Sequence, residues 1–391
     1  MTRSPRAGRR PVSLGALAAG ALVPALLIGG VWGYADANVP PPTTTTTTTL
    51  PPGRELVPLD TDLLSFRRHP TPLAVRQADA ASKSELEQRL AGVDESFDDT
   101  TCLRIVDDGA VLADFGTPGP LIPASNQKVL VAAVALDVLG ADHRFRTELR
   151  SARPVDGVVP GDVYLVGGGD PVLWTDGVTD PLRYPAFNTT SLDDLADRLV
   201  QLGITTIGGD VVGDGSRYDD EFRAPSWGDD ITNVDAGPYD ALLVNDGLIG
   251  NGNYGLDPSR SAARAFVDLL AERGIAVEGS AANAETPADA ELTTLAFIES
   301  EPLEDVLVEL LHTSDNNTAE LMVKEIGYAA TGEGTRTAGL AVVRDRLASW
   351  AVPLAGVELQ DGSGLSRDNR LTCAAPVSYT HLTLPTNTVT W

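Results

Sequence analysis

The sequence has few of the residues that bind nucleic acid or metal ions. Of its 391 residues only three are lysine and four are histidine, and the formal net charge is −26. Binding to nucleic acid needs clustered Lys and Arg that neutralise phosphate, so this acidity argues against such a partner. No H-E-x-x-H or G-x-S-x-G motif occurs. We expect no metal and no cofactor, because the histidines show no ligand spacing: His69, His143, His312 and His381.

Cysteine is also scarce. Cys102 and Cys373 are the only two, too few for a disulfide framework, and they do not form a Cys-x-x-Cys pair. In an exported protein they can form one bridge. The alternative is two unpaired buried thiols, and the sequence leaves both open.

The first 70 residues differ from the rest of the chain. In residues 1–37, four arginines precede an uncharged run that ends at Ala35, the pattern of an export signal peptide. The run is also long enough to serve as an uncleaved membrane anchor. Residues 38–70 are rich in Pro and Thr, which favours an extended linker. We therefore expect an exported, extracytoplasmic protein, either membrane-anchored or secreted.

From residue 71 the pattern predicts a folded protein of the mixed α/β (α+β) class. Between 141 and 295 short strand candidates alternate with glycine-rich turns and two helices, and after 300 a helical period returns. Gly167–Asp170 has no Lys-Ser/Thr after it, so we interpret it as a turn. The helices expected are 125–139, 192–202, 262–273, 304–312, 318–326 and 337–350; the strands expected include 101–106, 110–115, 162–166, 206–212 and 357–359.

Lys128 stands three residues after Ser125, at the start of an apolar helical segment. Arginine stays protonated in proteins, whereas a desolvated lysine can lose its proton and act as a base. Ser125 is therefore a candidate nucleophile and Lys128 its candidate base. The alternative is that this serine and lysine stand three residues apart by chance.

Ser314-Asp-Asn316 lies between two of the expected helices and is the only Ser-x-Asn in the chain. As a site it would supply a hydroxyl and an amide. The structural alternative is a helix N-cap, because Ser and Asp both accept hydrogen bonds from free backbone amides there.

Taken together, the two motifs make the chain resemble the penicillin-recognising serine acyltransferases. Within them it is similar to the D-alanyl-D-alanine carboxypeptidase/endopeptidase family of the penicillin-binding protein 4 type, peptidase family S13. The segments that carry the resemblance are Pro123–Leu130, Tyr164–Pro171, Ser314–Glu320 and Asp361–Arg367. The resemblance implies a β-lactamase/transpeptidase-like domain, with an antiparallel sheet flanked by helices, formed by 71–140 and 296–375. It also implies a mostly-β insertion of one or more domains at 141–295.

The family's chemistry implies roles for four residues. Ser125 would attack the D-Ala-D-Ala carbonyl of a peptidoglycan stem peptide, and Lys128 would take its proton. Ser314 would relay a proton to the departing D-alanine, and Asn316 would hold the substrate amide. β-Lactams would acylate Ser125 by the same path, which makes them covalent inhibitors, and the protein would work at the cell wall.

The chain departs from the family after Asp361–Arg367. The family's third motif, Lys-Thr/Ser-Gly, binds the substrate carboxylate and supplies an oxyanion donor, and no such triplet occurs here. Residues 376–391 turn rich in threonine, and 377–382 resemble a translated sequencing adapter, so we expect a non-native tail on a truncated, weakly active or inactive chain. A divergent natural terminus is the alternative.

Two other functions stay open: a catalytically silent wall-binding relative, and a β-lactam hydrolase. The sequence does not distinguish carboxypeptidase from endopeptidase preference or the diamino acid recognised. It also leaves open whether the N-terminal segment is cleaved.

Overall fold

The computed structural model describes residues 84–86, 88–90, 92, 98–107, 109–176, 178, 186–250 and 252–379. The expected leader or anchor, the Pro/Thr-rich linker and residues 380–391 of the expected tail lie outside the described residues, whereas residues 376–379 of that tail belong to the last helix. Across the described ranges, no helix is both long and apolar enough to span a bilayer.

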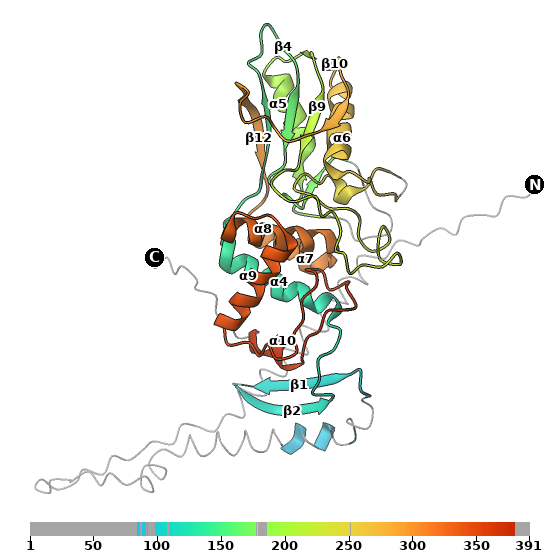
Figure 1. Ribbon diagram of the computed structural model, residues 1–391, viewed down its shortest axis with the longest axis vertical. Coiled ribbons are helices and arrows are strands. Elements are labelled where there is room, and N and C mark those ends of the chain that lie inside the picture. The colour runs from blue at the N-terminus through green and yellow to red at the C-terminus, as the bar shows by residue number, and fades with distance from the viewer. Residues whose placement is uncertain are drawn as a thin grey trace, which may run out of the picture. The chain divides into compact units, whose positions relative to one another are not determined.

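An antiparallel hairpin opens the folded part, as the sequence predicts (Figure 1). It consists of β1 (Cys102–Asp107) and β2 (Ala110–Gly116). Cys102 in β1 is disulfide-bonded to Cys373, so the structure has the paired alternative and not two free thiols. Cys373 immediately precedes α10 (Ala374–Tyr379), and the hairpin is thereby tied to residues far along the chain.

Four helices pack around one apolar core (Figure 1). They begin and end within a residue or two of the predicted positions, except that the third extends five residues further toward its C-terminus. The helices are α4 (Gln127–Leu139), α7 (Leu303–Thr313), α8 (Asn316–Thr331) and α9 (Arg336–Ser349). Helices α8 and α9 approach closely at Gly339, where a Cβ would collide with the Val323 carbonyl group. In the described parts of 71–140 and 300–379, the only named strands are those of the β1–β2 hairpin.

Residues 141–299 build a five-stranded mixed sheet in the order β11-β9-β5-β3-β12. Strands β12, β3 and β5 pair antiparallel, whereas β5, β9 and β11 pair parallel. The five strands are β3 (Arg146–Ser151), β5 (Val163–Val166), β9 (Val211–Asp214), β11 (Ala281–Asn283) and β12 (Thr293–Glu299).

Shorter pairings flank this sheet. A three-stranded parallel sheet has the order β10-β8-β4, and two further strands, β6 and β7, pair parallel with each other. These strands are β4 (Val158–Val159), β6 (Leu173–Trp174), β7 (Thr190–Ser191), β8 (Thr206–Ile207) and β10 (Ala276–Val277).

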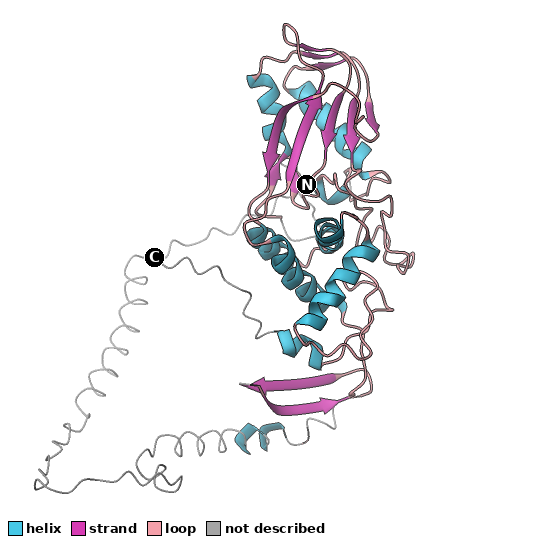
Figure 2. Ribbon diagram, turned by 60° about the vertical axis from the view of Figure 1, so that its left-hand side comes forward, coloured by secondary structure: helices cyan, strands magenta, loops and turns pink. Residues whose placement is uncertain are grey.

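Two predicted helices, α5 (Leu192–Gln201) and α6 (Pro258–Glu272), cover one face of the five-stranded sheet (Figure 2). Alternate strand residues such as Leu149 and Leu165 point into the apolar core between sheet and helices. The opposite face carries the other set of side chains, among them Arg150 and Asp214. That face is therefore polar.

Two expected strands are wrong in detail. The stretch 206–212 divides into β8 and β9, because Gly208 and Gly209 lie between two different sheets. The stretch 357–359 forms no strand. Its one ladder contact is an isolated bridge between Glu358 and Arg370, which is too short to extend a sheet.

Candidate active site

Ser125 lies in a single 3-10 turn, η2 (Ala124–Asn126), that leads into α4. The prediction that the α-helix begins at Ser125 is therefore wrong by two residues. Ala124, the first residue of this turn, has a left-handed backbone, with φ 48°. For a residue with a Cβ this conformation costs about 1–2 kcal/mol, and such strain is often stored at functional sites. Ser125 itself is exposed.

The Lys128 side chain is only 1% exposed and its ammonium nitrogen makes three hydrogen bonds. Nζ lies 3.0 Å from Ser125 Oγ, 2.7 Å from Asn316 Oδ1 and 2.9 Å from the Ser363 carbonyl oxygen. The structure thus brings together three of the four candidate residues, Ser125, Lys128 and Asn316. It adds Ser363, to which the sequence assigned no role.

The chemistry of these partners fixes the direction of the Lys128 lone pair. An amide oxygen and a backbone carbonyl oxygen can only accept hydrogen bonds. A neutral amine therefore donates its two N–H groups to Asn316 Oδ1 and to the Ser363 carbonyl. Its lone pair then faces Ser125 Oγ, whose hydroxyl proton can be donated to it. This is the arrangement that a general base requires.

Burial favours the neutral form of this amine. Desolvation lowers the pKa of Lys128 from 10.5 to about 8, while the charges of Asp315, Glu320 and Asp361 act in the opposite direction. A substantial fraction of the Lys128 side chains is thus neutral at mildly alkaline pH, whereas an exposed lysine would stay almost fully protonated there.

Asn316 is the first residue of α8, and both ends of its amide are engaged. Oδ1 accepts from Lys128, and Nδ2 donates to the Asp235 carbonyl oxygen at 2.8 Å. The helix cap is the neighbouring Asp315, whose carboxylate accepts from Thr318 N at 2.6 Å. The N-cap alternative for this motif therefore holds for Asp315, and Asn316 has a separate part in the site.

Ser314 lies apart from this hydrogen-bonded group. It follows α7 in a left-handed conformation, with φ 57° and ψ 38°, and is exposed. Among the described residues its hydroxyl has no hydrogen-bond partner, neither Lys128 nor Ser125. The relay role of Ser314 stays a prediction.

The loop 361–366 completes the surroundings of Lys128. The fully buried Asp361 carboxylate accepts hydrogen bonds from Trp227 Nε1 at 2.8 Å, from Asn369 Nδ2 at 2.7 Å, and from the backbone N–H groups of Gly364 at 2.9 Å and Ser366 at 2.6 Å. Asp361 thereby closes the loop into a fixed turn. The sequence showed this segment only as a family landmark.

Glu320 holds the same loop from the side of α8. Its carboxylate accepts from Gly362 N at 2.9 Å and from Ser363 N at 2.7 Å. Burial raises the pKa of Glu320 to about 7, with a further rise from the Asp361 charge, although these hydrogen bonds oppose it. Glu320 lies one turn after Asn316, so one helix positions two acceptors of Lys128, Asn316 directly and the Ser363 carbonyl through the loop.

The segment between the two motifs also contacts the site. Trp227 and Asp235 reach Asp361 and Asn316 as described, and Lys324 of α8 donates to the Glu221 carbonyl at 2.8 Å. Lys324 is buried against backbone carbonyls and Asp219, so it links α8 to the segment between the two motifs. In the described ranges no three His, Cys, Asp or Glu side chains cluster as metal ligands would.

Comparison with known families gives a match over most of the folded chain. The model of the D-Ala-D-Ala carboxypeptidase 3 (S13) family matches residues 82–252 and 255–379. A D-alanyl-D-alanine carboxypeptidase of Actinomadura sp. (strain R39) is 30% identical over 327 residues, covering 64% of this chain and 58% of that protein. A carboxypeptidase of Mycobacterium tuberculosis is 32% identical over 259 residues, covering 65% and 53%. The chain spans little more than half the length of these relatives.

A solved structure has the same fold. Penicillin binding protein 4 from Haemophilus influenzae superposes with a TM-score of 0.59 at 20% identity, covering 69% of this chain and 71% of that chain. This confirms the mixed α/β, transpeptidase-like fold class that the sequence implied.

Proposed function

The chain belongs to the D-Ala-D-Ala carboxypeptidase 3 (S13) family, and from this premise we propose that it is a serine D-alanyl-D-alanine carboxypeptidase/endopeptidase. Its substrates would be peptidoglycan stem peptides, and β-lactams would acylate the same serine. The observation that carries the proposal is the arrangement around Lys128, a buried amine whose two acceptors leave its lone pair for Ser125.

The reaction follows from this arrangement. Ser125 Oγ attacks the carbonyl carbon of the penultimate D-alanine while its proton passes to Lys128 Nζ. The tetrahedral adduct collapses, the peptide C–N bond breaks, and the proton from Lys128 reaches the departing amine of the terminal D-alanine. Ser314, which is exposed between α7 and α8 and lies two residues before Asn316, would carry this proton. Water then hydrolyses the acyl ester on Ser125.

Substrate binding would involve Asn316 in addition to its contact with Lys128. Its Nδ2 donates to the Asp235 carbonyl, so a substrate amide would replace or share that contact.

We also propose that the protein works outside the cytoplasm, anchored in the membrane by its N-terminal segment or secreted to the wall. The Cys102–Cys373 disulfide supports this, because such bonds persist in oxidising compartments. The basic and apolar composition of residues 1–37 supports it independently. Cell fractionation with antibody detection would test the location.

The test of the catalytic proposal is covalent labelling by a fluorescent penicillin, followed by intact mass and peptide mapping. We expect one adduct on Ser125, none in Ser125→Ala, and an unchanged yield in Ser349→Ala, a control at an exposed serine on α9. Label on another residue, or none on a folded wild-type chain, would contradict the proposal. The second result would favour the silent wall-binding relative.

Product analysis separates the remaining alternatives. Release of D-alanine from a stem pentapeptide supports carboxypeptidase action, and cleavage of cross-linked dimers supports endopeptidase action. Rapid turnover of the lactam without either product would favour a β-lactam hydrolase.

A further inference from the structure

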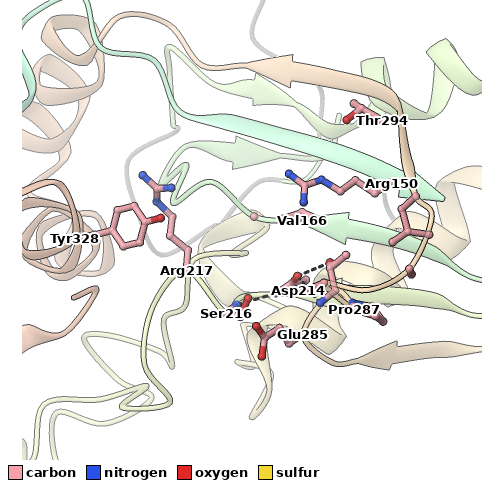
Figure 3. A pocket seen from close by; sticks show the side chains of 14 residues that line it. Arg150, Val166, Asp214, Ser216, Arg217, Glu285, Pro287, Thr294 and Tyr328 are labelled. Atoms are coloured by element: carbon pink, nitrogen blue, oxygen red, sulfur yellow. Dashed lines mark hydrogen bonds between the residues drawn. The ribbon is translucent and has the colours of Figure 1, made fainter. Parts of the chain in front are cut away.

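A cavity of about 570 Å³ lies on the polar face of the five-stranded sheet, which α5 and α6 do not cover (Figure 3). The parallel strands β5 and β9 end at its floor, and the segment that follows β11 forms one wall. In open sheets, ligands bind outside the carboxyl ends of parallel strands, because the loops that diverge there leave a crevice. Its volume is that of a typical small-ligand site.

Two guanidinium groups enter this cavity from different elements, Arg150 from β3 and Arg217 from the loop after β9 (Figure 3). Each guanidinium group is hydrogen-bonded to a buried carboxylate. Arg150 Nε donates to Glu148 at 2.6 Å, and Arg217 donates to Glu325 through Nε at 2.9 Å and Nη2 at 2.7 Å. These bonds fix the orientation of both groups before any ligand arrives.

Each guanidinium keeps one nitrogen for a ligand. In the part of the chain that the structure describes, Nη1 of Arg150 and Nη1 of Arg217 have no hydrogen-bond partner. Arg217 also lies 3.9 Å from the centre of the Tyr328 ring, which restrains it further. Planar N–H donors that face a cavity are suited to a carboxylate.

The wall of the cavity formed by the segment after β11 is hydrogen-bonded to the sheet. Asp214, at the end of β9, accepts from Ser216 N at 2.9 Å and from Thr286 N at 2.8 Å, so the segment 284–292 is tied to the sheet. Glu285 also lines the cavity and disfavours a ligand made only of negative charge. A peptide, with one carboxylate among neutral amides, suits this mixture better than a polyanion.

We propose that this cavity is a second, non-catalytic site that binds a carboxylate-bearing peptide of the cell wall, with the carboxylate on Nη1 of Arg150. That the peptide comes from the wall rests on the proposed function. Tyr328 and Asn316 lie twelve residues apart in α8, or about 18 Å along a helix. The peptide held here is therefore not the one that Ser125 attacks, and it anchors a neighbouring part of the polymer.

The test is calorimetric titration of the Ser125→Ala chain with acetyl-D-Ala-D-Ala, with its C-terminal amide, and with inorganic phosphate. We expect Arg150→Gln to weaken binding of the free acid about tenfold, because a charge-assisted hydrogen bond is lost. Binding of the amide should be weak and unchanged. Arg264→Gln, at an exposed arginine of α6, is the matched control and should bind like the parent.

Equal affinity of the parent and Arg150→Gln for the free acid would overturn the proposal. So would phosphate binding as tightly as the acid, since the cavity would then select any anion. Unfolding curves of Arg150→Gln check its fold, and Glu148 keeps Arg146 as a partner at 3.2 Å. The titration needs no turnover, so failure of penicillin labelling at Ser125 would remove the proposed function without deciding this site.

Discussion

At the scale of single residues, the proposed role of Lys128 as the base makes the acylation rate depend on its protonation. The pKa of Lys128 is lowered to about 8, chiefly by burial, and only the neutral amine can accept the Ser125 proton. We therefore expect the rate of acylation by penicillin to rise about tenfold per pH unit between pH 6 and 7.5, and to level off above pH 8. Stopped-flow labelling across pH 6 to 9.5 measures this.

Glu320 gives that profile a control specific to the site. The Glu320 charge raises the pKa of Lys128, so Glu320→Gln should move the rising limb toward lower pH while keeping the acceptor for Gly362 and Ser363. Glu358→Gln, at an exposed carboxylate, should leave the profile in place. A rate independent of pH, or equal shifts in both variants, would rule out Lys128 as the base.

The sequence predicted these residues unevenly, for a physical reason. Ser125 and Lys128 are one helical turn apart, so their spacing alone places them together. The contact of Lys128 with Asn316 joins residues 188 positions apart and was inferred only through a family resemblance. The Ser363 carbonyl could not be predicted at all, because a backbone oxygen leaves no signature in residue type.

At the scale of elements, the site depends on how the loop 361–366 packs against the turn that carries Ser125. Gly364 has φ 85°, and a Cβ there would collide with the Ala124 carbonyl. We expect Gly364→Ala to abolish labelling of Ser125, because either the loop or the serine turn must move. Penicillin labelling and urea unfolding together measure the effect.

Gly161→Ala is the matched control for this substitution. Gly161 has φ 87°, but no atom lies within 4 Å of the point that a Cβ would occupy. The change should therefore cost only about 1–2 kcal/mol of backbone strain and leave labelling intact. Full labelling in Gly364→Ala would mean that the loop does not position the serine. Loss in both variants would point to instability and not to the site.

Elements with a clear local pattern were predicted well, and those defined by distant partners were not. The hairpin β1–β2 has its turn residues and alternation in one short stretch, and α4 has an apolar run that ends at Gly140. The strand order β11-β9-β5-β3-β12 depends on contacts between distant segments, and β12 pairs with β3, which lies more than a hundred residues earlier. No local pattern specifies such an order.

At the scale of the molecule, the segment between the two motifs contributes contacts to the site. Trp227 donates to Asp361, and Asp235 accepts from Asn316. Arg217 and Lys324 form further hydrogen bonds between this segment and α8. Residues from three regions of the chain therefore hold Lys128. We infer that acylation depends on the whole described fold and cannot be assigned to the helical part alone.

The Cys102–Cys373 disulfide acts at this same scale, because it joins the first strand to a residue 271 positions later. Closing so long a loop restricts the unfolded chain, and such bonds contribute about 2–4 kcal/mol to the free energy of unfolding. We expect dithiothreitol to lower the urea midpoint of the wild-type chain accordingly. A Cys102→Ala/Cys373→Ala variant should start at the lower midpoint and show no response to the reductant. An equal midpoint with and without reductant would mean that the bridge does not form in solution, and the disulfide argument for an extracytoplasmic location would go with it.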